Sequence, residues 1–345
     1  MLAGAHAGGI GLAPGLSRRP RIGWSILPGM SAPLFVTVGE QEAGQPPRTP
    51  VVLDSPHSGH HFPTDFDSVL PVSALREAED CFIDALYTPA TALGIPLLAA
   101  CFPRTYLDVN RHVSDLDPEL LDGPWPGELV PTSKAALGKA LLWRTLDDGR
   151  PIYDRRLRVA EVLHRIDTCH RPYHAALRRL LDAAHATHGE VVHWNCHSMN
   201  SVGGAMSSDA GRPRADIVLG DRDGTTCDPA LTDWVRERFA ALGYEVRVND
   251  PFKGVELVRA YSAPGAGRHS LQVEINKRVY MDEVRREVLP HFAVLQSQIT
   301  DMLQALLRSL RRGPLPVHRD SARAPGSAPS FSAAPPAAPG VPDAR

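Results

Sequence analysis

The chain has 345 residues, a formal net charge of −2 at pH 7 and an apolar fraction of 43%. This length suits one large domain or two of ordinary size, and the nearly balanced charge gives no reason to expect nucleic acid as a partner. No run of about 20 uninterrupted apolar residues occurs, so no membrane-spanning helix is expected.

The five cysteines indicate a reducing compartment. They are odd in number, scattered and without a C-x-x-C spacing, so no disulfide framework is expected. The N-terminal segment also fails as a secretory signal, because its arginine-rich run at 18–21 follows the apolar residues instead of preceding them. We therefore predict a cytoplasmic protein.

Composition divides the chain into three parts. Residues 1–30 are predicted to be a disordered extension, upstream of an alternative start at Met30. Residues 313–345 are rich in Pro, Ala and Ser, and such a segment buries too little apolar surface to offset the entropy of ordering, so a disordered tail is expected. Residues 31–312 are then expected to form a single domain.

Strand-like and helical patterns alternate through this domain. Strands are expected at 51–54, 95–100, 105–109, 191–196, 217–219, 244–248 and 270–275. Helices are expected at 78–93, 155–188, 229–242 and 282–310. Alternation of this kind predicts an α/β fold with a largely parallel sheet covered by helices on both faces.

Three motifs place a polar side chain where an apolar strand should end. They are LDSPHSG at 53–59, VVHWNCHSMNS at 191–201 and LQVEIN at 271–276, and they carry His57, His197 and Glu274. Ligands of open α/β sheets gather beyond the carboxyl ends of the strands. Two imidazoles and a carboxylate there indicate a hydrolytic zinc site. The alternative for His57 is a loop histidine with a local hydrogen bond, and His60 and His61, which follow it, are expected to be surface loop residues.

A third metal ligand is expected from the segment after residue 78. A helix starting there would place Asp80 and Asp84 on one face. Asp80 is the predicted ligand, which leaves the fourth position of a tetrahedral zinc for water. The alternative is that both carboxylates oppose the helix dipole near its N-terminus.

Glu274 is the predicted general base. Strand alternation puts Gln272, Glu274 and Asn276 on one face, opposite three apolar residues. A glutamate desolvated in such a strand has a raised pKa, which suits proton transfer near neutral pH. The alternative is a structural salt bridge to Lys277, Arg278 or another cation.

Arginine and asparagine side chains suggest a carboxylate-binding subsite. The segment PRTYLDVNR supplies Arg104, Asn110 and Arg111, and GVELVRAYS supplies Arg259. A guanidinium fork and an amide suit a substrate carboxylate. Such arginines otherwise form surface ion pairs.

With these motifs in order, the chain resembles the N-formylglutamate amidohydrolase family. The resemblance covers roughly residues 49–283 and rests on the following segments: PHSG, EDCFIDALY, PRTYLDVNR, NCHSM, DIVLGDRDGTTC, GYEVRVNDPFKGVELVRAYSAP and HSLQVEINKRVYMDE. It implies a three-layer αβα fold similar to zinc carboxypeptidases and aspartoacylases, and a divalent metal, most simply zinc. It also implies hydrolysis of a formyl or small acyl amide on an acidic amino acid, at the end of histidine breakdown.

The chain departs from related patterns in two places. His60 stands where zinc carboxypeptidases carry the glutamate of a His-x-x-Glu pair, so the acidic ligand must come from elsewhere. Gly254-Val255 stands where two glycines are expected in the substrate loop.

The first hypothesis is therefore a metal-dependent N-formylglutamate hydrolase acting on a small-molecule substrate. A second keeps the chemistry but assigns another acyl-amino acid or a cell-wall peptide as substrate. A third is a non-catalytic binding protein on the same fold, which predicts loss of His57, His197 or Glu274, and all three are present.

Overall fold

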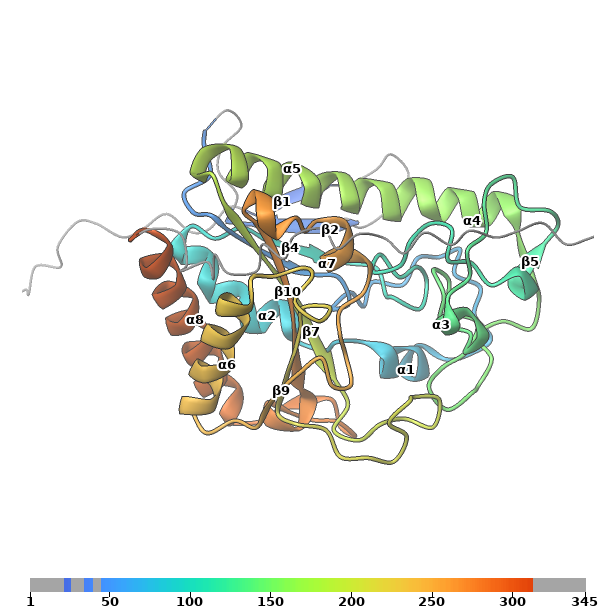
Figure 1. Cartoon of the computed structure of the whole chain (residues 1–345). Coiled ribbons are helices and arrows are strands. Elements are labelled where there is room, and N and C mark those ends of the chain that lie inside the picture. The colour runs from blue at the N-terminus through green and yellow to red at the C-terminus, as the bar shows by residue number, and fades with distance from the viewer. Residues whose placement is uncertain (1–21, 26–33, 40–44, 313–345) are drawn as a thin grey trace, which may run out of the picture.

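The computed structural model describes residues 22–25, 34–39 and 45–312. Within these residues an eight-stranded mixed sheet lies at the centre, in the order β1-β2-β4-β3-β7-β10-β8-β9 (Figure 1). Its strands are β1 (Ile22–Ser25), β2 (Phe35–Val38), β3 (Val51–Ser55), β4 (Leu97–Ala100), β7 (Val191–Met199), β8 (Ile217–Gly220), β9 (Val246–Val248) and β10 (Arg268–Asn276). Strand β1 falls inside the predicted N-terminal extension; the rest of that extension and the predicted tail lie outside the described residues.

Two small sheets accompany the main one. Strand β5 (Leu121–Asp122) pairs with β6 (Leu157–Arg158), and β11 (Met281–Asp282) pairs with β12 (Glu287–Val288).

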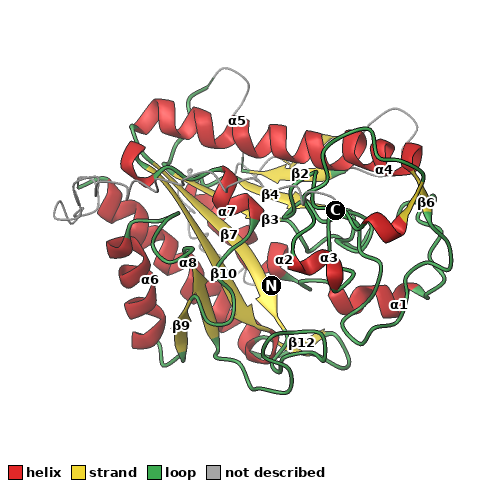
Figure 2. Ribbon diagram, turned by 45° about the vertical axis from the view of Figure 1, so that its right-hand side comes forward, coloured by secondary structure: helices red, strands yellow, loops and turns green. Residues whose placement is uncertain are grey.

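Helices cover both faces of the sheet, as the sequence predicts (Figure 2). The helices on one side are α4 (Val159–Arg165), α5 (Arg171–His188) and α7 (Glu256–Ala260), and those on the other are α2 (Ile83–Tyr87), α6 (Pro229–Ala241) and α8 (His291–Leu310). Two short helices, α1 (Val72–Leu75) and α3 (Ser133–Ala136), lie in the segments beyond the strand ends. None of the helices in the described ranges is both long and apolar enough to cross a membrane.

The central strands β3, β7 and β10 run parallel, so their carboxyl ends meet at one edge. In the register of β7 and β10, Glu274 lies beside His197 and Gln272 lies beside Asn195. Alternate residues of a strand point to opposite faces. On β7 the apolar alternates Val192, Trp194 and Cys196 pack under α6 and α8.

The other face of these strands carries a buried row of polar side chains. Its members are Asp54, His193, Asn195, His197, Ser270, Gln272 and Glu274. This row confirms the predicted alternation in β10 and leads along the sheet to the strand ends.

Three predicted elements differ from the structure. Residues 105–109 form no strand, because their backbone groups have other partners. The N–H groups of Tyr106 and Asp108 donate to the carbonyls of Pro103 and Leu141, and His174 Nε2 lies 2.8 Å from the carbonyl oxygen of Val109. The predicted helix at 78–93 does not begin until Ile83, since Phe82 adopts a left-handed conformation with φ of 65°. Asp80 and Asp84 therefore do not share a helix face.

The last predicted helix also starts late, at His291. The nine residues before it form the β11–β12 turn, in which the Asp282 carboxylate accepts hydrogen bonds from the backbone N–H groups of Val284 and Arg285. Local side-chain acceptors of this kind favour turns over helix.

Candidate active site

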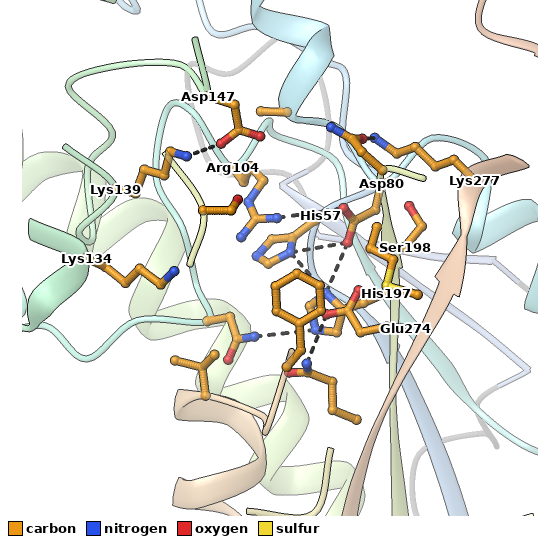
Figure 3. Close-up of a pocket in the computed structure, with 18 of the residues that line it drawn as sticks. His57, Asp80, Arg104, Lys134, Lys139, Asp147, His197, Ser198, Glu274 and Lys277 are labelled. Carbon is orange, nitrogen blue, oxygen red and sulfur yellow. Dashed lines mark hydrogen bonds and ion pairs between the residues drawn. The ribbon is translucent and has the colours of Figure 1, made fainter. Parts of the chain in front are cut away.

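A cavity of about 160 Å³ opens at the carboxyl ends of β3, β7 and β10 (Figure 3). His57 follows β3, His197 lies near the end of β7, and Glu274 lies near the end of β10. Asp80 comes from the turn before α2, and its backbone N–H donates to the carbonyl of His57 at 3.0 Å. Segments far apart in the chain thus supply one site.

Three of these side chains converge on one point. His57 Nδ1 and His197 Nδ1 are 3.1 Å apart. Asp80 Oδ2 lies 3.4 Å from His57 Nδ1 and 3.0 Å from His197 Nδ1. All three residues are buried.

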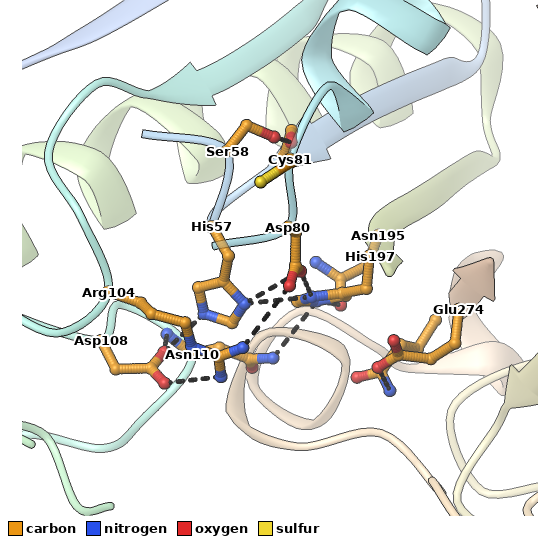
Figure 4. A network of polar contacts seen from close by, with 12 residues as sticks. His57, Ser58, Asp80, Cys81, Arg104, Asp108, Asn110, Asn195, His197 and Glu274 are labelled. Carbon is orange, nitrogen blue, oxygen red and sulfur yellow. Dashed lines mark hydrogen bonds and ion pairs between the residues drawn. The ribbon is translucent and has the colours of Figure 1, made fainter. Parts of the chain in front are cut away.

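The remote nitrogen of His57 is bound by a residue that the sequence analysis did not assign. Nε2 lies 2.7 Å from Asp108 Oδ1, and the buried carboxylate can only accept, so Nε2 carries the proton (Figure 4). Burial acts to raise the pKa of Asp108, but His57 and Arg104 outweigh it and hold that pKa well below its usual range. The ionised carboxylate therefore sets the tautomer in which Nδ1 of His57 faces Asp80.

The tautomer of His197 is set by a longer chain of contacts. Asn195 Nδ2 donates to Asp54 Oδ1 at 2.7 Å, which turns the Asn195 carbonyl oxygen toward His197. His197 Nε2 then donates to that oxygen at 2.8 Å, so its Nδ1 carries no proton in the neutral ring. His193 Nε2 bonds to the same Asp54 carboxylate at 2.8 Å.

Two unprotonated nitrogens and one carboxylate oxygen thus face one another. All three are acceptors, and without a cation between them one imidazole would have to take up a proton. Nitrogen and oxygen donors in this number are the set that a zinc ion with an open fourth position takes from proteins. These residues fit a divalent metal.

The structure shows which of two carboxylates, Asp80 or Asp84, lies beside the two histidines. Asp80 reaches both imidazoles, whereas Asp84 lies in the first turn of α2 and does not line the cavity. Burial raises the pKa of Asp84. Burial also acts to raise the pKa of Asp80, but the neighbouring His197 and His57 outweigh it and hold that pKa well below its usual range. His60 is 63% exposed in its side chain and is not part of the cluster.

Glu274 is buried beside the cluster and has no cationic partner. Its Oε1 accepts from Gln272 Nε2 at 2.9 Å, and no lysine or arginine of the described chain forms an ion pair with it. Lys277, the predicted alternative partner, donates instead to Asn200 Oδ1. Burial raises the pKa of Glu274 to about 7, with His197 acting against this shift and Asp80 adding to it. Such a carboxyl group can accept and return a proton near neutral pH.

Arg111 and Asn110 line the cavity, and hydrogen bonds to other segments fix their positions. The Asn110 side-chain oxygen accepts from the backbone N–H of Leu257 at 2.9 Å. His170 Nε2 lies 2.9 Å from the carbonyl oxygen of Arg111, which a π-helical segment at Ile166–His170 brings within reach. Burial lowers the pKa of Arg111. No carboxylate in the described ranges approaches this guanidinium more closely than Asp115 Oδ2, 4.0 Å from Nε.

The other two predicted arginines differ from Arg111. Arg104 lines the cavity but is paired, with Nη2 2.9 Å from Asp108 Oδ2 and Nη1 3.7 Å from Asp80 Oδ1. Arg259 does not line the cavity: its half-exposed side chain is ion-paired with Glu256 at 2.8 Å. The structure therefore does not bring Arg259 to the cavity with Arg104 and Arg111, because this i, i+3 pair on α7 holds its guanidinium outside.

The cavity also receives residues that the sequence analysis did not assign to it. Those bearing charge are Glu77, Lys134, Lys139, Asp147, Arg214 and Lys277. Among the residues that the sequence analysis missed, Asp108 stands in an alternating pattern between Leu107 and Val109, and it binds His57 without lining the cavity itself. Lys134 lies on the four-residue helix α3 and Lys139 in an irregular segment, and neither belongs to a periodic pattern in the sequence.

Comparison with known proteins assigns this chain to a family. The family model described as N-formylglutamate amidohydrolase matches residues 49–281. The chain belongs to this family.

Relatives of this amidohydrolase family span most of the chain. N-formylglutamate deformylases of Pseudomonas putida and Pseudomonas aeruginosa are each 30% identical to it and are covered over 93% of their lengths, with 75% and 76% of this chain aligned. The crystal structure of an N-formylglutamate amidohydrolase from Ralstonia eutropha JMP134 is 45% identical, with a TM-score of 0.75 over 81% of this chain and 99% of that one. The α/β fold and the hydrolase class that the sequence predicts are confirmed.

The convergence of acceptors leads to a prediction about metal content. The purified protein should carry about one divalent metal ion per chain, because His57, Asp80 and His197 offer three ligands of the usual kind. His57→Ala, His197→Ala and Asp80→Ala should each lose it, as measured by elemental analysis.

The matched controls are His60→Ala and Asp84→Ala, which change neighbouring residues of the same types outside the cluster. Both should keep the metal. Wild-type metal content in the His57 and His197 variants would contradict the assignment, and loss in Asp84→Ala with retention in Asp80→Ala would mean that the wrong carboxylate was chosen.

Proposed function

We propose that this protein hydrolyses N-formyl-L-glutamate to formate and L-glutamate, with a divalent metal, most simply zinc, held by His57, Asp80 and His197. The observation that carries the proposal is the meeting of three metal-type acceptors with a buried, unpaired Glu274 whose pKa is raised to about 7. The names of the relatives support the choice of substrate.

When bound, such an ion polarises the formyl carbonyl and lowers the pKa of water at the site. Glu274 removes a proton from the attacking water while the oxygen of that water forms a bond to the formyl carbon. The same carboxyl then gives that proton to the amide nitrogen as the C–N bond breaks. Formate and the free amine of glutamate are the products, so atoms and protons balance.

The charge of the cavity suits a dianionic substrate. Six cationic and four acidic side chains of the described residues line it; the cations are Arg104, Arg111, Lys134, Lys139, Arg214 and Lys277, and the acids are Glu77, Asp80, Asp147 and Glu274. Arg111 is the natural contact for a substrate carboxylate, because its planar fork is buried and without a close acidic partner. Asn110, whose Nδ2 lies 3.4 Å from His197 Nε2, places that carboxylate near the reacting amide.

A substrate panel tests the proposal directly. N-formyl and N-acetyl derivatives of Glu, Asp and Gln should be compared by release of the free amine. N-formyl-L-glutamate should give the highest kcat/KM, since the formyl group is small and both carboxylates find cations. Higher activity on N-acetyl or peptide substrates would favour another acyl-amino acid or a cell-wall peptide, and no turnover with metal bound would favour a binding protein.

The role of Glu274 makes a separate prediction. Glu274→Gln keeps the shape and the contact with Gln272 but cannot accept a proton, so kcat should fall by roughly 10²-fold or more. Metal content should stay at the wild-type level, as measured on the same samples. Near-normal turnover in this variant would show that Glu274 is structural and that another group is the base.

Arg111 is predicted to select for charge. Arg111→Met should lower kcat/KM for N-formylglutamate by about 2–5 kcal/mol of transition-state stabilisation, the usual cost of leaving a buried charge without its partner. An uncharged N-formyl amide should lose far less. Equal losses on both substrates would mean that Arg111 supports the fold, which its bonds to the carbonyls of Lys139 and Asn110 would then explain.

A further inference from the structure

One end of the cavity carries a positive charge that no acidic residue of the described chain pairs with. Lys134 and Lys139 lie there, on the side away from Glu274 (Figure 3). Lys139 is ion-paired with Asp147. The ammonium group of Lys134, by contrast, makes no hydrogen bond or ion pair with any residue that the structure describes.

The position of Lys134 is fixed relative to Arg111. Asp115 accepts from both the backbone N–H and the hydroxyl of Thr132, at 2.8 and 3.0 Å, and Thr132 caps α3 by accepting from the Lys134 N–H. The Lys134 carbonyl accepts from the Lys139 N–H at 2.8 Å. The Lys139 carbonyl in turn accepts from Arg111 Nε at 3.1 Å. A short hydrogen-bonded frame therefore holds the two cations over one end of the cavity.

The surroundings of Lys134 disfavour its charge. Burial lowers its pKa, and the neighbouring charges of Arg111, Lys139 and Arg104 lower it further, against which Asp147 alone acts. The charged form of a lysine that lies among cations without an acidic partner is stabilised when an anion binds beside it.

The other cavity cations are committed to partners. Arg214 forms a two-pronged pair with Asp209, at 2.7 and 2.9 Å. Lys277 donates to Asn200 Oδ1 at 2.9 Å.

We propose that Lys134 is the specificity-determining residue that binds the side-chain carboxylate of an N-acylated dicarboxylic amino acid, while Arg111 and Asn110 bind its α-carboxylate. This inference rests on the proposed function and deepens it by assigning the second charge of the substrate. The α-carboxylate goes to Asn110 and Arg111 because Asn110 contacts His197, beside the reacting amide. The carboxylate further from the amide then reaches the end of the cavity where Lys134 lies.

The test compares charged and uncharged substrates of one shape. Lys134→Met should raise KM for N-formyl-L-glutamate about tenfold or more, the usual effect of removing one charged hydrogen-bond partner. Its kcat should stay close to wild type, and both constants for N-formyl-L-glutamine should be unchanged. Lys134→Arg, which keeps the charge, should restore most of the affinity.

Lys253→Met is the matched control, because Lys253 is exposed, is paired with Asp223 and does not line the cavity. It should leave all constants unchanged. Equal losses on both substrates in Lys134→Met would show a structural role, and an unchanged KM for N-formyl-L-glutamate would place the second carboxylate elsewhere. Either result overturns the inference.

Binding of glutarate, measured by calorimetry, separates this inference from the proposed function. Glutarate offers two carboxylates with the spacing of glutamate and no bond to cleave. Its Kd should rise about tenfold in Lys134→Met and not in Lys253→Met, whether or not the wild type turns over N-formylglutamate. The same Kd for glutarate in Lys134→Met and in the wild type, or no binding of glutarate to the wild type, would overturn the assignment of Lys134.

Discussion

The site depends on where two imidazole protons lie. Asp108 accepts the proton on Nε2 of His57, and Asp54, acting through Asn195, directs the proton on Nε2 of His197. Both carboxylates are buried, and their pKa values are lowered because contacts with histidines outweigh burial. Because those protons are on the Nε2 atoms, the two Nδ1 atoms carry none and face each other and Asp80. Acidic residues that do not line the cavity thus set the orientation of the two imidazoles that do.

The sheet makes this arrangement possible because it carries polar side chains on one face only. The apolar alternates of β7 and β10 fill the core under α6 and α8, so the opposite row can be polar without weakening that core. Every member of the row is buried, and burial of a polar group is tolerated when it is hydrogen-bonded. Asp54, His193 and Ser270 satisfy one another deep in the sheet. Glu274 lies at the open end of the same row, where burial without a cation shifts its pKa.

The strand-end motifs could be read from the sequence because parallel strands bring their carboxyl ends together whatever their distance along the chain. That rule alone brings His57, His197 and Glu274 to one place. It could not predict Asp108, since the segment around it is shaped by side-chain contacts with His170 and His174, which come from a helix about sixty residues later. The sequence pattern places Asp80 on a helix face, whereas Asp80 lies in a turn that ends at the left-handed Phe82 and meets the two histidines from there. Lys134 reaches the cavity only through the frame around Asp115, which no periodic pattern records.

The strand order also constrains how the polypeptide assembles as it is synthesised. Strand β10 is the last of the eight to be made, yet it lies between β7 and β8, both already synthesised. Until it arrives, β7 and β8 each present an unpaired edge, which is open to mispairing with other chains. The inserting strand brings Glu274 into register with His197 in the same event. A nascent or truncated chain that ends before residue 268 therefore has two additional unpaired sheet edges, at β7 and β8, and lacks Glu274. Insertion of β10 pairs both edges and supplies this residue.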